Sequence, residues 1–246
     1  MLLVKAGKEQ LLGPLQSVSG IVERRHTLPI LSNVLIERKG ARLTYLATDI
    51  EIQIRTGSET GEGNDGAVTV GARKLQDILR SLPEGVDVSL LIEEKRLQVK
   101  AGRSRFNLQT LPADDFPRML LTQDETVKLT VSQKAFKGLI AQTQYAMAAQ
   151  DVRYYLNGML LMIEASEVRA VSTDGHRLAF ASVALTEKLG KREMILPRKT
   201  VLELQRLLAD SDEPLTIEAG NNQVRFSFGE IELVSKLIDG KVPDYT

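Results

Sequence analysis

The two halves of this sequence carry the same signals in the same order, and this internal repeat constrains the fold more than any other feature. The matching positions lie a nearly constant distance apart. The separation is 124 residues for Asn33 and Asn157, 125 for Thr48-Asp49 and Thr173-Asp174, 125 for Arg73-Lys74 and Arg198-Lys199, and 126 for Pro117 and Pro243. Such a period is far longer than a solenoid repeat and is the size of a small domain. The sequence therefore predicts an internal duplication.

Two domains of one fold follow from the repeat, a first copy over residues 1–122 and a second over residues 123–246. The boundary is expected in the stretch LLTQDETVK, residues 120–128. This stretch comes after a proline and is polar in its middle, as a linker is.

Each copy combines helical and strand patterns. Apolar residues at steps of three and four, together with Pro and Ser at starting positions, predict helices over 8–26, 72–82, 132–148 and 197–210. Alternation of apolar and polar residues, clearest in LTYLATDIEIQIR, predicts half-buried strand pairs. The expected fold class is therefore α+β, with two helices packed on antiparallel sheets in each copy.

The composition excludes several classes of chemistry. The 246 residues include no cysteine and two histidines, so disulfides, thiolate zinc sites and cysteine nucleophiles are excluded and a histidine-rich metal site is not expected. The sequence shows no signal peptide and no apolar run long enough for a membrane helix, which favours a cytoplasmic protein. No cofactor is expected.

The net charge is zero, but the charge is unevenly distributed. The four predicted helices together carry +6, and the remaining residues carry the balancing negative charge. One interpretation is that lysine and arginine simply occupy the solvated faces of the helices. The other is that the helices present a positive surface to phosphates.

Seven motifs spread along the chain resemble one family. They are LPIL at 28–31, TDIEI at 48–52, RSRFNLQTLPADDFP at 103–117, QDVRYYLNGML at 150–160, STDGHRLA at 172–179, LPRK at 196–199 and SKLIDGKVPDY at 235–245. Together they resemble the first two domains of the bacterial sliding clamps, the β subunits of DNA polymerase III.

The resemblance implies a DNA-clamp fold and a processivity factor without catalytic activity. Family members have three such domains, and their homodimers close a ring around duplex DNA. They bind the polymerase catalytic subunit, an ATP-driven clamp loader and other proteins that carry short clamp-binding motifs. Because this sequence ends at Thr246, we expect the third clamp domain to be absent. We also expect a truncated form that does not close a normal ring and is a monomer or weak dimer.

The resemblance also implies three sets of site residues. The predicted peptide-binding residues are Arg153, Leu156, Thr173, Gly175, His176, Arg177, Leu178 and Pro243. The predicted DNA-binding residues are Arg25, Arg73, Lys74, Gln150, Tyr154, Arg198 and Lys199. The predicted subunit-interface residues are Lys74, Arg103, Arg105, Phe106 and Leu108.

Several alternatives stay open at this point. The stretch STDGHRLA also has the pattern of a hairpin with Asp174-Gly175 in its turn. Tyr154 fits ordinary strand packing as well as a DNA contact, either Arg24 or Arg25 could face DNA, and the role of Tyr155 is undecided. The stretch SRFNLQ is either an internal strand or an edge strand that pairs with another subunit.

Two other classes of function compete with the clamp. A metal-dependent hydrolase could use an aspartate such as Asp174 with His176, but no third ligand, Walker motif or nucleophile elbow accompanies them. A protein-only module would bind clamp-binding peptides or the clamp loader without encircling DNA. The sequence predicts that the chain is not an enzyme.

Overall fold

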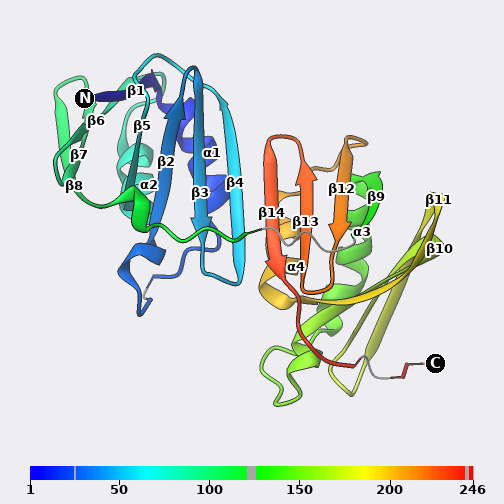
Figure 1. Ribbon diagram of the computed structural model, residues 1–246. Coiled ribbons are helices and arrows are strands. Elements are labelled where there is room, and N and C mark those ends of the chain that lie inside the picture. The colour runs from blue at the N-terminus through cyan, green and yellow to red at the C-terminus, as the bar shows by residue number, and fades with distance from the viewer. Residues whose placement is uncertain (25, 121–125, 242–243, 246) are drawn as a thin grey trace. The chain divides into compact units, whose positions relative to one another are not determined.

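The computed structural model describes residues 1–24, 26–120, 126–241 and 244–245. The chain divides into two compact units, Met1–Met119 and Leu120–Thr246 (Figure 1). The predicted boundary after residue 122 lies three residues beyond this division. Each unit is described below by itself.

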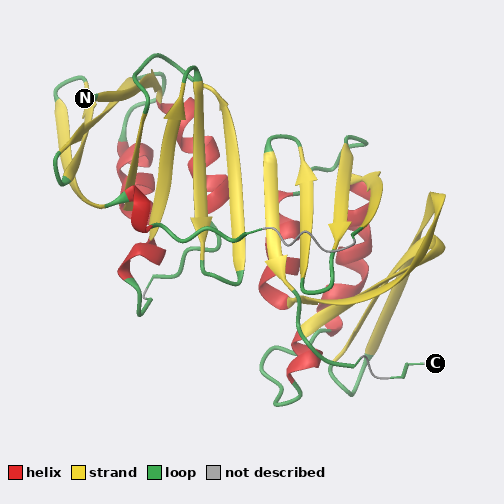
Figure 2. Ribbon diagram, in the orientation of Figure 1, coloured by secondary structure: helices red, strands yellow, loops and turns green. Residues whose placement is uncertain are grey.

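The first unit holds two helices and eight strands among its described residues (Figure 2). The helices are α1 (Lys8–Ser19) and α2 (Ala72–Ser81). The strands are β1 (Leu2–Gly7), β2 (Asn33–Lys39), β3 (Arg42–Thr48), β4 (Ile52–Glu59), β5 (Gly66–Gly71), β6 (Asp87–Glu93), β7 (Arg96–Ala101) and β8 (Ser104–Leu111). They pair in the order β1-β6-β7-β8-β5-β2-β3-β4, and every pair is antiparallel. Two short 3-10 helices, η1 (Pro29–Ser32) and η2 (Ala113–Asp115), complete the unit.

The second unit also holds two helices, and its described residues form six strands, two of which are much longer than any strand of the first unit. Its helices are α3 (Gln133–Thr143) and α4 (Arg198–Leu207), and its 3-10 helices are η3 (Gln144–Ala146) and η4 (Tyr154–Asn157). Its strands are β9 (Val127–Ser132), β10 (Gly158–Thr173), β11 (Leu178–Pro197), β12 (Pro214–Ala219), β13 (Gln223–Phe228) and β14 (Ile231–Lys236). Four of these pair in the order β14-β13-β12-β9, and β10 pairs with β11, again antiparallel throughout. The predicted α+β class with antiparallel sheets is confirmed.

The strand register repeats between the two units. Thr48 pairs with Gln53 in the first unit, and Thr173 pairs with Leu178 in the second, each 125 residues later. β10 covers the positions of both β2 and β3, and its register with β11 shifts on either side of Ala165. The duplication inferred from dipeptide spacing is therefore present in the backbone pairing itself.

Two positive-φ positions also recur at the same interval. Gly40 has φ 58° and its counterpart Ala165 has φ 51°, while Ile50 has φ 79° and its counterpart Gly175 has φ 88°. Glycine adopts this left-handed region at little cost, whereas a β-branched residue there is strained. The turn conformation is thus kept in both copies even where only one of them carries glycine.

Two predicted helices end earlier than the apolar spacing indicates. α1 ends at Ser19, whose hydroxyl bonds back to the Leu15 carbonyl at 2.5 Å, and Gly20 follows as the C-cap. α3 ends at Thr143, whose hydroxyl donates to the Leu139 carbonyl at 2.9 Å, and the chain continues as the 3-10 turn η3. Side-chain bonding of a Ser or Thr hydroxyl to the preceding turn competes with the regular helix at both ends.

Apolar side chains from helix and sheet fill each core. In the second unit Phe136 of α3 meets Phe226 of β13 with ring centroids 5.9 Å apart. Buried or half-buried ammonium groups close the ends of two helices. Lys8 Nζ donates to the Leu82 carbonyl at 2.5 Å, and Lys137 Nζ donates to the Leu208 carbonyl at 3.0 Å. A cation at these carbonyls also complements the helix dipole. No helix within the described residues is long and apolar enough to cross a membrane.

Exchanging the residues at the matched turns tests this shared backbone. Ile50→Gly should raise the free energy of unfolding by about 1 kcal/mol, because it removes a β-branched side chain from positive φ. The reciprocal change Gly175→Ile should lower it by at least as much. Urea unfolding followed by circular dichroism measures both, and two variants as stable as the parent would contradict the strained turn.

Candidate functional site

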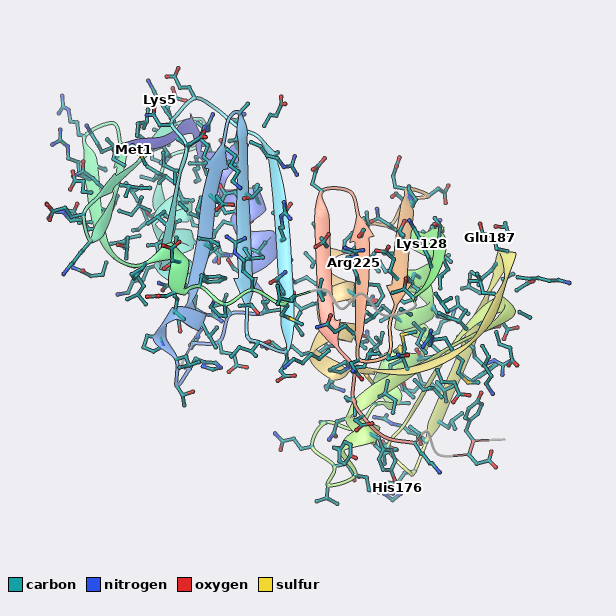
Figure 3. All side chains as sticks on the ribbon, viewed as in Figure 1. Met1, Lys5, Lys128, His176, Glu187 and Arg225 are labelled. Atoms are coloured by element: carbon teal, nitrogen blue, oxygen red, sulfur yellow. The ribbon has the colours of Figure 1, made fainter. Side chains whose placement is uncertain are left out.

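The hairpin between β10 and β11 is built around one aspartate. The Asp174 carboxylate accepts the backbone N–H groups of His176 at 2.9 Å and Arg177 at 3.0 Å, and it also accepts Arg177 Nε at 3.0 Å. These bonds lower the pKa of Asp174, the backbone bond from His176 most of all. His176 lies at the exposed tip of this hairpin (Figure 3). The stretch is therefore a hairpin with Asp174-Gly175 in its turn, as its residue pattern predicts.

The loop that precedes η4 is closed by a second aspartate. Arg153 donates three bonds to the Asp151 carboxylate, from its backbone N–H at 2.8 Å, its Nε at 2.9 Å and its Nη2 at 2.8 Å. Asn157 completes the loop by accepting the Asp151 N–H at 2.8 Å and donating to the Asp151 carbonyl at 2.9 Å. The Arg153 guanidinium lowers the pKa of Asp151 to about 2. Arg153 is thus held in one orientation before any ligand arrives.

The loop and the hairpin meet at a glycine. A Cβ added to Gly175 would stand 3.1 Å from Arg153 Nη2, so the guanidinium lies directly against the turn. On the far side of the turn the Arg177 guanidinium lies over the ring of Tyr145, 5.6 Å from its centroid. The structure therefore brings three predicted peptide-binding residues together, Arg153, Gly175 and Arg177.

A small apolar pocket lies beside this polar rim. Its volume is 30 Å³, and its lining residues are Tyr155, Leu156, Gly158, Leu160, Val171, Thr173, Ile195 and Tyr245. Two predicted peptide-binding residues, Leu156 and Thr173, are among them, although Leu156 is only 5% exposed and also supports the core. Leu178 stays 47% exposed on β11 and does not line the pocket. Pro243 lies outside the described residues.

The predicted DNA-binding residues gather at the starts of matched helices. Arg73 and Lys74 begin α2 and are exposed, while Arg198 and Lys199 begin α4 and are half-buried. Arg73 Nη2 also donates to the Val22 carbonyl at 2.8 Å, which ties the loop after α1 to α2. The four helices together carry nine basic and three acidic residues, a net charge of +6, as the sequence indicates.

The remaining DNA-binding residues lie in loops. Gln150 is exposed just before η4. Tyr154 belongs to η4 rather than to a strand, so of the two alternatives the structure does not show strand packing, and a DNA contact stays a prediction. Tyr154 is 59% exposed, and its ring meets that of Tyr155 edge-on at 6.0 Å. Arg25 lies outside the described residues, so the choice between Arg24 and Arg25 stays a prediction.

The predicted subunit-interface residues lie on or beside β8. β8 pairs with β7 from Ser104 to Gln109 but with β5 only through Thr110 and Leu111. Its other side is thus unpaired over 104–109 as far as the described strands go. Arg105 is exposed on this stretch, Phe106 is half-buried, and Leu108 is buried.

Two more of these residues flank the unpaired stretch. Arg103 is exposed in the turn before β8. Lys74 lies with Leu108 on a 370 Å³ pocket beside the start of α2. β8 is therefore internal in the strand order, through its pairing at Thr110 and Leu111, but it presents an open edge over 104–109.

The described residues form no candidate metal-binding site. Nowhere among them do three or more His, Asp or Glu side chains stand close enough to hold a metal ion. Asp49 and Asp174 lie in separate units, and each accepts the backbone N–H groups of its own turn. Their shared role is therefore to form a turn.

Comparison with known proteins matches both units. Residues 3–120 match the family model of the DNA polymerase III beta subunit, N-terminal domain, and residues 130–244 match that of its central domain. The chain belongs to the family of DNA polymerase III β subunits. The beta sliding clamp of Pseudomonas putida is 48% identical over 243 residues, and that of Escherichia coli (strain K12) is 46% identical over 239 residues. In each case 97% of this chain is covered and 65% of the relative, so the chain spans about two thirds of the length of these curated relatives.

Solved clamps share the fold. The DnaN sliding clamp of Pseudomonas aeruginosa bound to griselimycin has a TM-score of 0.95 and 45% identity, covering 99% of this chain and 66% of that one. The Caulobacter crescentus pol III beta structure has a TM-score of 0.91 and 40% identity, covering 100% and 68%. The predicted family and clamp fold are confirmed.

Sequence reasoning missed several residues of the site. Asp151 stands two positions before Arg153, and an Asp whose side chain accepts the backbone N–H two residues on is the local signal of an Asx-turn. Tyr145, Leu160, Val171 and Tyr245 come from distant parts of the second unit and carry no local signal. Tyr155, whose role was undecided, lines the pocket.

Replacing Arg153 tests whether its guanidinium lowers the pKa of the Asp151 carboxyl group. In Arg153→Ala the pKa of Asp151 should rise from about 2 toward its ordinary value of 3.8, because the two guanidinium hydrogen bonds and the ion pair are lost, while the backbone N–H of residue 153 still bonds to the carboxylate. The parent should accordingly keep stability above pH 4 that it loses as the pH falls toward 2, since a lowered pKa in the folded state stabilises the ionised form. NMR titration of the carboxyl carbon measures this. Arg177→Ala is the control and should leave Asp151 unchanged; an unmoved Asp151 pKa in Arg153→Ala would contradict the assignment.

Proposed function

We propose that the chain carries the N-terminal and central domains of a DNA sliding clamp, the processivity factor of a replicative polymerase. The observation that carries the proposal is the match of both units, in order, to the two domain models of one family. The proposed partners are duplex DNA, the DNA polymerase III catalytic subunit, the clamp loader and other proteins with clamp-binding motifs. The proposed place of action is the cytoplasm, and the proposed role needs no catalysis by this chain.

The charge pattern suits a protein that slides. A net +6 on four helices is enough to attract phosphates, and contacts with phosphates carry no sequence information. The number of basic residues is also modest, so binding to DNA releases few counterions and the affinity for DNA is low. We propose that Arg73, Lys74, Arg198 and Lys199 contact the DNA backbone in this way.

We propose further that the hairpin, the Arg153 loop and the apolar pocket form the peptide-binding site. A pocket wall of Leu and Tyr side chains suits an apolar anchor, and the fixed guanidinium beside it suits a backbone carbonyl or a carboxylate. The unpaired stretch of β8 is proposed as the contact with another clamp subunit, because an open edge pairs readily with a strand from a second chain.

DNA binding should depend on salt and on the matched helix starts. The double variants Arg73→Ala/Lys74→Ala and Arg198→Ala/Lys199→Ala should each weaken duplex binding. Each should also flatten the plot of log affinity against log salt, by roughly one unit for each phosphate that the variant no longer neutralises. Fluorescence anisotropy with a labelled duplex measures both effects.

The matched control is Lys95→Ala/Arg96→Ala, an equal loss of charge at the exposed Lys95 in the turn after β6 and at the exposed Arg96 that begins β7. The control should bind DNA as the parent does. Absent or salt-insensitive DNA binding, with peptide binding retained, would instead favour the protein-only module.

Peptide binding should depend on the exposed wall of the hairpin. Leu178→Ala should weaken binding of griselimycin, the compound bound by the Pseudomonas aeruginosa clamp, by about tenfold, or about 1.4 kcal/mol, because it removes exposed apolar surface next to Thr173, the strand partner of Leu178 that lines the pocket. Leu202→Ala is a matched control, since Leu202 is 44% exposed on α4. Isothermal titration calorimetry compares them, and equal affinities would remove Leu178 from the site. Leu156→Ala is unsuitable here, because truncating a buried leucine would lower stability as well.

A further inference from the structure

The apolar cluster that lines the pocket of the second unit has a counterpart in the first. Leu35 and Leu46 form one buried cluster, and Leu160 and Val171, each 125 residues later, belong to another. Ile30 packs against the first cluster as Tyr155 packs against the second, again 125 residues apart. The same backbone frame therefore builds one apolar cluster twice, and the two clusters can be compared directly.

In the first unit the cluster is filled by the chain itself. Phe116 is 4% exposed and is part of the cluster with Leu35 and Leu46. Its backbone N–H donates to the Ala113 carbonyl at 3.1 Å, at the end of η2. Just after it, the Met119 N–H donates to Gln53 Oε1 at 2.8 Å. The segment is fixed on both sides of Phe116, so this ring is a permanent part of the core.

In the second unit an aromatic side chain, Tyr245, also lies at the pocket, but its interactions are weaker than those that fix the segment around Phe116. Tyr245 packs against the cluster and remains half-buried. Its hydroxyl donates to Met162 Sδ at 2.9 Å and accepts a long bond of 3.4 Å from Arg169 Nη1. A thioether is a weak acceptor, and a 3.4 Å bond is near the outer limit of a useful one.

The fit around Tyr245 is also incomplete. The pocket keeps 30 Å³ of space although Tyr245 forms part of its lining. Such a gap weakens the dispersion attraction between the ring and the wall. Tyr245 also reaches the pocket from a different position, since it follows Pro243 by two residues whereas Phe116 directly precedes the matched Pro117.

We propose that Tyr245 occupies part of the apolar pocket of the second unit in the free chain and that a binding partner must displace this side chain. The proposal rests on the proposed peptide-binding function of this pocket. The incoming group is an aromatic or branched aliphatic side chain, because it replaces a ring on walls of Leu, Val, Ile and Tyr. Binding breaks the interactions that Tyr245 makes in the free chain, so these interactions reduce the affinity for every partner alike.

Removing the occupant should strengthen binding. Tyr245→Ala should tighten griselimycin binding by about tenfold in calorimetry, and Tyr245→Phe should tighten it by less, since only the hydroxyl bonds are removed. Phe180→Ala is the control: Phe180 is half-exposed and contacts Arg169 at 5.1 Å, but it does not line the pocket. Its affinity should match that of the parent. Unchanged or weaker binding by Tyr245→Ala would overturn the proposal.

A second readout does not depend on ligand affinity. The chain has no tryptophan, so Tyr245→Trp introduces a single indole whose emission reports its surroundings. The emission should be blue-shifted in the free protein and should move to the red when griselimycin is added. If the indole of the free protein emits at the wavelength of a fully solvent-exposed tryptophan, that result alone would overturn the proposal. The parent and all variants could instead fail to bind griselimycin while the indole emission of ligand-free Tyr245→Trp is blue-shifted. That result would contradict the proposed peptide-binding function but would still place the side chain at position 245 in the pocket.

Discussion

Antiparallel pairing of β2 with β5 and of β3 with β4 sets the frame of the first unit, and the pairing of β10 with β11 repeats it in the second. Successive side chains of a strand point to opposite faces, so a register slip of one residue would turn every apolar side chain outward. Because the register is kept at an interval of 125 residues, matched residues face the same way in both units. The helices, turns and pockets take their places from this pairing.

A shared frame makes the differences between the copies informative. Where the first copy has Leu28-Pro29-Ile30 at the start of its 3-10 helix, the second has Arg153-Tyr154-Tyr155. In the first set Leu28 and Pro29 are exposed and Ile30 packs against the core, whereas the second set provides a guanidinium, an exposed ring and a pocket wall. Both copies carry Arg-Lys in the first turn of their second helix, so the positive helix start is common to the copies while the residues before the first long strand differ.

Much of the fold could be predicted from the sequence because its signals are local. The Asp-Gly turn, the Arg-Lys helix starts and their repetition are all visible within a few residues. The ends of α1 and α3 could not, because they depend on the hydroxyl bonds of Ser19 and Thr143 within the folded helix. For Tyr154 the sequence did not distinguish strand packing from a DNA contact, and the structure places it in η4 together with the buried Leu156. The site residues came from the family resemblance, and the meeting of Tyr155 with Tyr245 required the structure, since 90 residues separate them.

The turn at Asp174-Gly175 has a consequence for the proposed peptide-binding site. Gly175 has φ 88°, so any side chain there is strained by the backbone, and the Arg153 guanidinium would also have to shift slightly. Asp174 is constrained as well, because it holds the turn through two backbone N–H groups. In the proposed site, a ligand that rests on the backbone of this turn would therefore contact two positions at which substitution is unfavourable. Variation in binding would then arise mainly at the exposed side chains of the rim, His176 and Leu178.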